Sequence, residues 1–172
     1  MTVRTEPGTR VRPAAAGDLP RLTEIYNHYV TATPITFDIE PYTVERRRAW
    51  FDAHPGGRHR LLVAVRDGDV AGYATSGPFR AKAAYATSVE VSVYCAADAT
   101  GAGVGSALYR ALFAALAAED VHRAYAGVTL PNDASLRLHR RFGFRDVGVF
   151  GQAGRKFGRY WDVAWLQRPL GG

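Results

Sequence analysis

Three short stretches in this chain of 172 residues carry side chains whose types and spacing could do chemistry. The first is SVEVSVYC, in which Glu90 lies among valines. The second is the glycine-rich turn TGAGVGS, and the third is NDASLRLH, which contains Asn132 and His139. A carboxylate can act as a general base, a glycine-rich turn before a helix can bind phosphate, and an imidazole can transfer a proton near neutral pH.

In the glycine-rich turn, Gly101, Gly103 and Gly105 alternate with other residues just before a helical pattern. The N–H groups of a helix N-terminus bind phosphate without a basic side chain, and glycines let the backbone come close. No lysine follows the glycines, as a nucleoside-triphosphate loop requires, and Ser106 stands where a dinucleotide fingerprint needs its third glycine. By its spacing alone, the turn could also be flexible and bind nothing.

The strand predicted over residues 87–95 alternates, so that valines and Cys95 face one way while Glu90, Ser92 and Tyr94 face the other. Partial burial would raise the pKa of the Glu90 carboxyl toward neutrality, where a base accepts protons most effectively. The alternative for Glu90 is a solvent-facing side chain on an ordinary strand.

The third stretch opens a predicted helix. Asn132 stands where it can cap that helix, which by itself explains its presence. Ser135 and His139 lie four residues apart and therefore share one helical face. His139 could donate a proton near neutral pH, or it could be a surface histidine among neighbouring arginines.

The elements that must position these residues alternate along the chain. Strands are predicted over residues 10–13, 59–66, 70–79, 87–95, 123–129, 146–150 and 157–167, and helices over about 18–30, 43–54, 104–119 and 131–142. Asp18 and Thr43 are predicted caps, and Asp67-Gly68 signals a hairpin. This order predicts an α/β (α+β) fold with a mixed sheet and helices on both faces, not a purely parallel one.

Composition narrows the class of protein. The net charge is +6, but the basic residues are scattered, which fits a small anionic ligand better than nucleic acid. No apolar run is long enough to span a membrane, and Cys95 is the single cysteine, so we expect a cytoplasmic protein without an internal disulfide. We expect a flexible tail over residues 1–8 and one domain over residues 9–170.

Together, Glu90 before VYC, GAGVGS at a helix start and NDASLRLHRRFGF resemble the GCN5-related N-acetyltransferase (GNAT) family, over about residues 10–170. VSVYC, GVGSALY, TLPNDASLRLH, GFRDVG and the tail GRKFGRYWDVAWLQRPL are most similar to the phosphinothricin and methionine-sulfoximine N-acetyltransferases, the tail being the most specific part. The resemblance implies the GNAT fold, with a mostly antiparallel sheet of about seven strands, acetyl-CoA as co-substrate, no metal, and a homodimer.

The resemblance also implies where acetyl-CoA binds. The pyrophosphate would be held by Gly101, Ala102, Gly103, Val104, Gly105 and Ser106. The backbone of Val93, Tyr94 and Cys95 would pair with the pantetheine arm where the sheet splays, and Asn132 would bond near the thiol end. Thr100 and Ala102 depart from the family, which often has polar or basic residues there, so we expect backbone binding to dominate and affinity to be weaker.

For the chemistry, the resemblance implies direct attack of an amine on the thioester. Glu90 would be the base, acting directly or through water, and an N–H of Tyr94 or its neighbour would bind the developing oxyanion. His139 would be the acid, at a position where many relatives have tyrosine.

The substrate implied is a small amino acid or analogue. Arg80 would bind its carboxylate and Phe37 would line its pocket, although Arg80 could be a surface arginine and Phe37 a core residue. The aromatic residues Phe157, Tyr160 and Trp161 could add pocket walls, dimer contacts or core packing.

Two alternatives to a small-molecule N-acetyltransferase remain at this stage. One is a protein or peptide N-acetyltransferase of the same fold. The other is a non-catalytic module that binds acetyl-CoA or nucleic acid.

Overall fold

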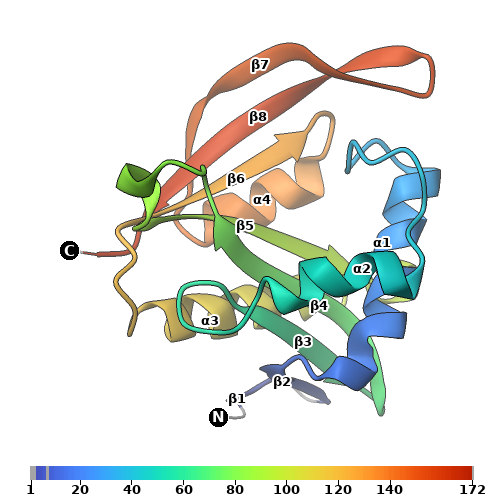
Figure 1. The fold of residues 1–172 in the computed structure, drawn as a ribbon, viewed down its shortest axis with the longest axis vertical. Coiled ribbons are helices and arrows are strands. Elements are labelled where there is room, and N and C mark those ends of the chain that lie inside the picture. The colour runs from blue at the N-terminus through green and yellow to red at the C-terminus, as the bar shows by residue number, and fades with distance from the viewer. Residues whose placement is uncertain (1–2, 7, 172) are drawn as a thin grey trace.

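The computed structural model describes residues 3–6 and 8–171, in which eight strands form one sheet (Figure 1). The strands are β1 (Val3–Glu6), β2 (Thr9–Pro13), β3 (Leu61–Arg66), β4 (Asp69–Pro78), β5 (Ser88–Cys95), β6 (Arg123–Thr129), β7 (Arg145–Lys156) and β8 (Arg159–Pro169), in the spatial order β1-β2-β3-β4-β5-β6-β8-β7. β5 and β6 run parallel and the other neighbouring pairs run antiparallel. The expected mixed and mostly antiparallel sheet is thus confirmed, with one more strand than predicted.

In the part of the chain that the structure describes, four α-helices cover the two faces of the sheet (Figure 1). They are α1 (Leu19–Ala32), α2 (Val44–Asp52), α3 (Val104–Leu116) and α4 (Asp133–Arg141). α3 and α4 touch through Tyr109 and His139 on one face, while aromatic side chains of α1 touch Tyr94 on the opposite face. No helix in the described part of the chain is long and apolar enough to cross a membrane.

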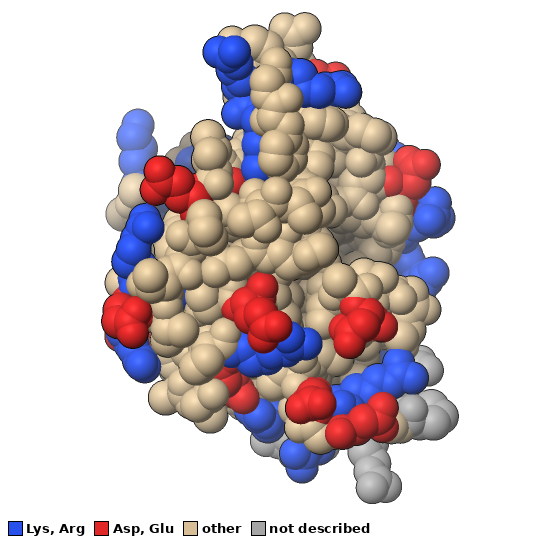
Figure 2. Space-filling view, turned by 90° about the vertical axis from the view of Figure 1, so that its right-hand side faces the viewer, with Lys and Arg blue, Asp and Glu red and all other residues tan. Residues whose placement is uncertain are grey.

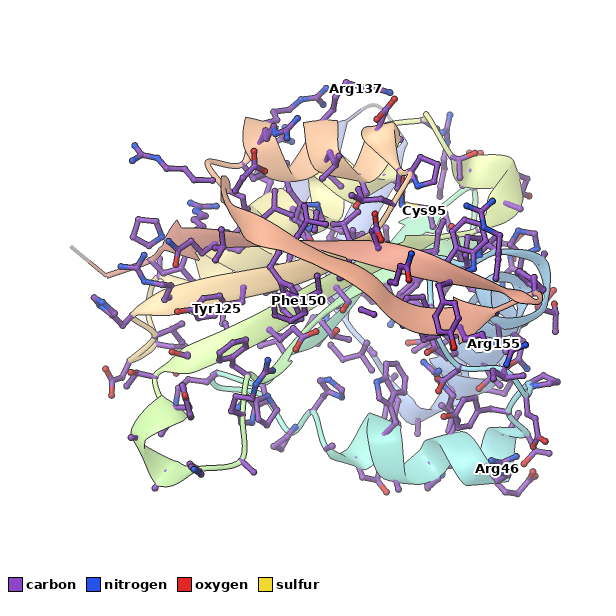
Figure 3. All side chains as sticks on the ribbon, turned by 90° about the horizontal axis from the view of Figure 1, so that it is seen from above. Arg46, Cys95, Tyr125, Arg137, Phe150 and Arg155 are labelled. Carbon is purple, nitrogen blue, oxygen red and sulfur yellow. The ribbon has the colours of Figure 1, made fainter. Side chains whose placement is uncertain are left out.

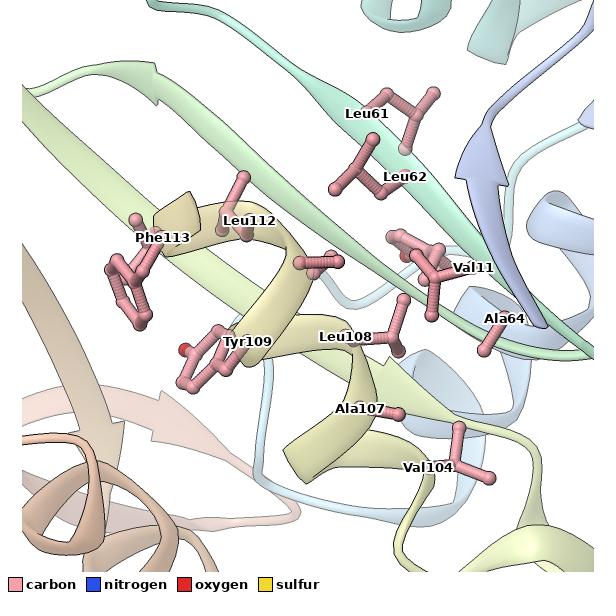
Figure 4. Close-up of a cluster of buried hydrophobic side chains, with 14 of the residues drawn as sticks. Val11, Leu61, Leu62, Ala64, Val104, Ala107, Leu108, Tyr109, Leu112 and Phe113 are labelled. Atoms are coloured by element: carbon pink, nitrogen blue, oxygen red, sulfur yellow. The ribbon is translucent and has the colours of Figure 1, made fainter. Parts of the chain in front are cut away.

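The main core lies between α3 and the sheet (Figure 4). The helix buries apolar residues at helical spacing, among them Val104, Leu108 and Leu112. They pack against strand residues such as Val11 and Leu62, so α3 and its N-terminus are fixed against the sheet.

Two local caps agree with the sequence and one does not. The Thr43 side chain accepts a hydrogen bond from Arg46 N, and Asn132 Oδ1 accepts one from Ser135 N at 3.1 Å. Asp18 stands before α1, but its carboxylate accepts from Ala15 N and from Arg12 instead of capping the helix. The Arg12 ion pair and a preceding 3₁₀ turn hold this carboxylate away from α1.

Both ends of the chain depart from the expectation. Residues 3–6, within the segment expected to be a flexible tail, form β1 and pair with β2, as in Val3 opposite Val11. At the other end, β7 continues to Lys156, and β7 and β8 form one long hairpin with its turn at Phe157-Gly158. The segment 151–156 was not predicted as strand because its glycines lack the alternation that marks one.

Candidate active site

The parallel strands β5 and β6 separate after three paired positions. Ser88, Val89 and Glu90 lie opposite residues 123–125, and no further β5–β6 pairs follow in the described chain. Beyond this point the strands splay and leave a narrow cavity of about 50 Å³, which we call the slot. Its lining residues are Ile35, Val91, Ser92, Val93, Tyr94, Tyr109, Gly127, Val128, Thr129, Asn132, Ser135 and His139. Seen from above, the sheet and the β7–β8 hairpin lie between α4, which carries Arg137, and α2, which carries Arg46 (Figure 3).

The open edge of β5 presents unpaired backbone groups to the slot. Ala96 N donates to Ala71 O across the β4 side, and the β4–β5 register is regular. In an antiparallel pair, alternate residues direct both N–H and C=O to the same neighbour. Tyr94 therefore directs its backbone groups to β4, whereas Val93 and Cys95 direct theirs to the slot. The Cys95 carbonyl already accepts from the Tyr29 hydroxyl, which leaves its N–H and both Val93 groups.

The glycine-rich turn opens α3 beside this edge. Gly101 and Gly103 have φ of 75° and 79°, a region that favours glycine, and the helix begins at Val104. The N–H groups of the first turn have no partner within the helix, so residues 104–106 form a potential anion site. A Cβ on Gly105 would lie 3.2 Å from Leu138, which explains why α3 can approach α4 and β5 so closely.

A side chain from α4 supplies positive charge to the turn, a contact that no local sequence pattern indicates. Arg141 Nη1 donates to Ser106 Oγ at 3.2 Å, whereas Thr100 Oγ1 donates back to Ala97 O. The sequence showed Arg141 only as one of several arginines around His139, because a contact between residues 35 positions apart has no local signal.

Cys95 follows the slot-lining Tyr94 on β5, and its side chain has the character of a buried thiol. Burial raises the pKa of this thiol to about 11, against the opposing effect of the Gly105 N–H. The thiolate is therefore scarce at neutral pH, which disfavours Cys95 as an acyl-accepting nucleophile.

Glu90 and Arg80 lie toward the other end of β5, where they interact through charge without an ion pair within 4.0 Å among the described residues. Burial raises the pKa of the half-buried Glu90 carboxyl, and the nearby charge of Arg80 opposes this rise. Arg80 itself is exposed, stacks over Phe79 at 4.2 Å and lies 5.6 Å from the centroid of Trp165. Arg80 lines a neighbouring cavity of about 750 Å³ and not the cavity that Glu90 lines, so the predicted base and the predicted carboxylate ligand are near each other but not in one pocket.

Glu90 lines a cavity of about 350 Å³, which we call the Glu90 pocket. Its lining residues are Ile35, Thr36, Phe37, Glu90, Ser92, Tyr94, Gly127, Thr129, Phe150, Ala153, Val163 and Trp165. Phe37 packs directly on Gly154, where any side chain would overlap its ring. Lys156, 4% exposed, donates to Thr36 O at 2.8 Å and so ties the hairpin to the loop that carries Phe37.

The aromatic walls of the Glu90 pocket differ from those proposed from the sequence. Phe157 and Tyr160 are 56% exposed near the hairpin tip, and Trp161 Nε1 donates to Lys156 O. Instead, Trp165 and Phe150 line the pocket. Alternation along β8 could have identified Trp165, since it shares a strand face with Trp161.

His139 is buried and fully engaged. Its Nδ1 lies 2.8 Å from Ser135 O, and its Nε2 lies 2.8 Å from the Tyr109 hydroxyl. Because a carbonyl can only accept, the ring proton belongs on Nδ1, and Nε2 accepts from Tyr109. Burial lowers the pKa of His139, so the neutral ring prevails near pH 7. Proton donation by His139 is therefore disfavoured. The Tyr109 hydroxyl, which is hydrogen-bonded to His139, belongs to a residue that also lines the slot.

Charge on the outside is mixed. On the face in Figure 2, Lys and Arg groups are interspersed with Asp and Glu, and basic groups gather on the projecting hairpin. This face shows no continuous basic strip of the kind that binds nucleic acid.

Comparisons with known proteins agree with this geometry. The model of the acetyltransferase (GNAT) family matches residues 22–144. A phosphinothricin N-acetyltransferase of Streptomyces coelicolor is 61% identical over 170 residues, covering 95% of this chain and 99% of that protein. An L-methionine sulfoximine/L-methionine sulfone acetyltransferase of Pseudomonas paraeruginosa is 38% identical, covering 93% and 94%. A crystal structure of a phosphinothricin acetyltransferase from Sinorhizobium meliloti with acetyl-CoA has a TM-score of 0.91 and 34% identity, covering 95% and 89%.

Proposed function

The chain belongs to the acetyltransferase (GNAT) family and is an N-acetyltransferase, and on this premise we propose a substrate and a mechanism. The proposed substrate is a small amino acid of the phosphinothricin or methionine sulfoximine type, acetylated on its α-amine. Glu90 is the general base in this proposal. The homologues named for these substrates support the substrate class.

One observation carries the proposal: the slot and the Glu90 pocket share a wall. Ile35, Ser92, Tyr94, Gly127 and Thr129 line both cavities. A ligand on the open edge of β5 and a second ligand beside Glu90 would therefore meet at Ser92 and Tyr94. This is the arrangement that direct transfer between two bound ligands requires.

The residues of the slot fit acetyl-CoA, which supplies the acetyl thioester when it is bound. The N–H groups at Val104, Gly105 and Ser106 would hold the pyrophosphate, with Arg141 adding charge. The Val93 carbonyl and one of the two free N–H groups, of Val93 or Cys95, would pair with the amides of the pantetheine arm. Asn132, whose Oδ1 caps α4, would offer its amide N–H₂ near the thiol end.

Glu90 would remove the proton of the α-ammonium group, directly or through one water. Its raised pKa lies closer to that of the amine than an ordinary glutamate would, which favours proton transfer. An N–H at the open edge, from Val93 or Cys95, would bind the oxygen on which negative charge develops. The departing sulfur would take its proton from water, since Tyr109 donates its hydroxyl proton to His139 and burial raises the pKa of Tyr109.

Arg80 would bind the α-carboxylate as a planar fork, and Phe37 with Trp165 would enclose the amino-acid backbone. The cytoplasmic location and the homodimer stay predictions.

The test is thiol release from acetyl-CoA with phosphinothricin, methionine sulfoximine, a panel of amino acids and a peptide with a free N-terminus, with product mass measured. We expect acetylation of the two analogues with kcat/KM well above that of the peptide. A peptide preferred over every amino acid would favour a protein N-acetyltransferase, and thiol release with none of them would contradict the proposed substrate class.

A further inference from the structure

Arg47 on α2 is a buried guanidinium without an acidic partner. Its residue is 4% exposed, and its Cζ lies 3.9 Å from the ring centroids of both Tyr26 and Trp50. Nη2 donates to the Tyr73 hydroxyl at 3.2 Å. Within residues 3–6 and 8–171, no carboxylate lies within 4.0 Å of Arg47 and its Nε has no hydrogen-bond partner.

A buried charge of this kind is costly unless something compensates it. The two aromatic rings, which lie over the faces of the guanidinium, offset part of this cost. The edge of the guanidinium, where anions bind, still has an N–H group without a hydrogen-bond partner. Asp38 lines the same cavity, yet it already accepts from the hydroxyls of Tyr26 and Tyr42, and its charge acts on Lys156. The positive charge of Arg47 is thus available to an incoming oxyanion.

A cavity of about 190 Å³ lies beside Arg47, large enough for a small polar group. Its lining residues are Tyr26, Asp38, Tyr42, Arg47, Trp50, Tyr73, Thr75, Ser92 and Tyr94. Ser92 and Tyr94 also line the slot and the Glu90 pocket, so this Arg47 cavity opens on the wall where the two ligands would meet.

The two arginines lie toward opposite ends of the same strand face. Burial raises the pKa of Glu90, and the charge of Arg80 opposes this rise. Arg47 donates a hydrogen bond to Tyr73, which lies opposite Tyr94 of β5. Glu90 and Tyr94 are four residues apart, about 13 Å along a strand, with Ser92 midway. An extended amino acid with its amine near Ser92 therefore has one arginine toward each end.

We propose that Arg47 is a specificity-determining residue that binds the oxygen-bearing tail of the substrate. The ligand chemistry is a phosphinate, sulfone or sulfoximine oxygen at the end of the amino-acid side chain, while Arg80 binds the α-carboxylate. Thr75 and Ser92 line the same cavity and offer hydroxyls to the second oxygen. This inference rests on the proposed function, and it assigns to Arg47 the choice of amino acids whose side chains end in such oxygens.

The test compares L-methionine sulfone with L-methionine, which differ only in the two sulfone oxygens. The wild-type enzyme is expected to prefer the sulfone in kcat/KM by at least tenfold. Arg47→Met, similar in length but uncharged, should reduce this preference by roughly tenfold to a hundredfold, the usual range for losing a hydrogen bond to a charged group. The kcat/KM for methionine, which lacks the sulfone oxygens, should fall by a smaller factor than the kcat/KM for the sulfone.

Arg48→Met, an exposed neighbour on α2, is the matched control and should keep the preference. Arg47→Lys keeps the positive charge but lacks the planar guanidinium, so it should keep part of the preference for the sulfone. A wild-type enzyme that does not distinguish the sulfone from methionine overturns the proposal without any variant. Equal loss on both substrates in soluble, folded Arg47→Met also overturns it, because Arg47 would then act on the common part of the substrate or on the fold.

Calorimetry separates this inference from the proposed function. If the wild-type enzyme acetylates no amino acid, the proposed function fails, and binding of methionine sulfone to the CoA-loaded protein decides about Arg47. Binding that weakens at least tenfold in Arg47→Met supports the subsite. Absent binding, or equal binding by both proteins, overturns it.

Discussion

The slot and the Glu90 pocket share a wall but are built from different parts of the polypeptide. The slot follows the open edge of β5, and beside it, outside the slot's own lining, the N-terminus of α3 offers further backbone N–H groups. The pocket is bounded by side chains from β5, β8 and the loop around Phe37, with Lys156 holding hairpin and loop together. A backbone site depends on glycines and helix position, whereas a side-chain site depends on individual residues. We therefore expect substitutions to separate cofactor binding from amine chemistry.

The largest expected effect separates the two regions most clearly. Glu90→Gln should lower kcat/KM for the amine by on the order of a hundredfold to ten-thousandfold, the range for losing a general base. Acetyl-CoA affinity, measured by calorimetry, should be unchanged because Glu90 does not line the slot. Full activity at neutral pH would remove Glu90 as the base.

The next effect tests Arg80, the proposed carboxylate ligand beside the Glu90 pocket. Arg80→Ala should raise the KM for amino acids on the order of tenfold or more, since a charge-assisted contact is lost, with a smaller change in kcat. A substrate analogue without the carboxylate should show no such rise. An unaltered KM for the amino acid would place Arg80 outside the site.

A smaller effect is expected on the slot. Arg141→Met should weaken acetyl-CoA binding by several-fold, and more strongly at low salt, since Arg141 adds one charge to a site dominated by backbone. Arg137→Met, exposed on the same helix, is the control. If Arg141→Met binds acetyl-CoA as wild type does, Arg141 has no part in cofactor binding. Thr100→Arg should conversely tighten binding.

The smallest effect concerns stability. A raised pKa means that the folded state favours the neutral Glu90 carboxyl, so its contribution is present below the unfolded pKa and is lost as pH rises through the folded pKa. Glu90→Gln should therefore raise Tm slightly at pH 8 relative to wild type, and the difference should shrink near pH 4. A Tm difference that grows toward low pH would contradict the direction of the shift.

The contrast between a site built mainly from backbone and a site built from side chains also explains how much of each could be predicted from the sequence. The glycine turn, the Asn132 cap and the alternation of β5 are local patterns, and the structure has them where they were expected. β6 was predicted with its observed bounds, Arg123–Thr129. These features made the slot recognisable from the sequence.

The side-chain half was predicted less completely because its contacts join distant parts of the chain. Trp165 reaches the pocket only through the pairing of β8 with β6, and Arg141 reaches Ser106 only through the packing of α4 on α3. Arg47 is the middle residue of three consecutive arginines, and the sequence does not show which of the three is buried. Burial and long-range packing, which no local pattern encodes, decided these roles.

The pH dependence of kcat/KM in the wild type and in Glu90→Gln tests the central claim most directly. Burial raises the pKa of Glu90 above the usual 4.5, and only the carboxylate accepts a proton, so wild-type activity should fall as pH falls through that raised value. The residual activity of Glu90→Gln should lack this acid limb while acetyl-CoA binding persists. The same acid limb in both proteins would contradict the assignment of Glu90 as the general base.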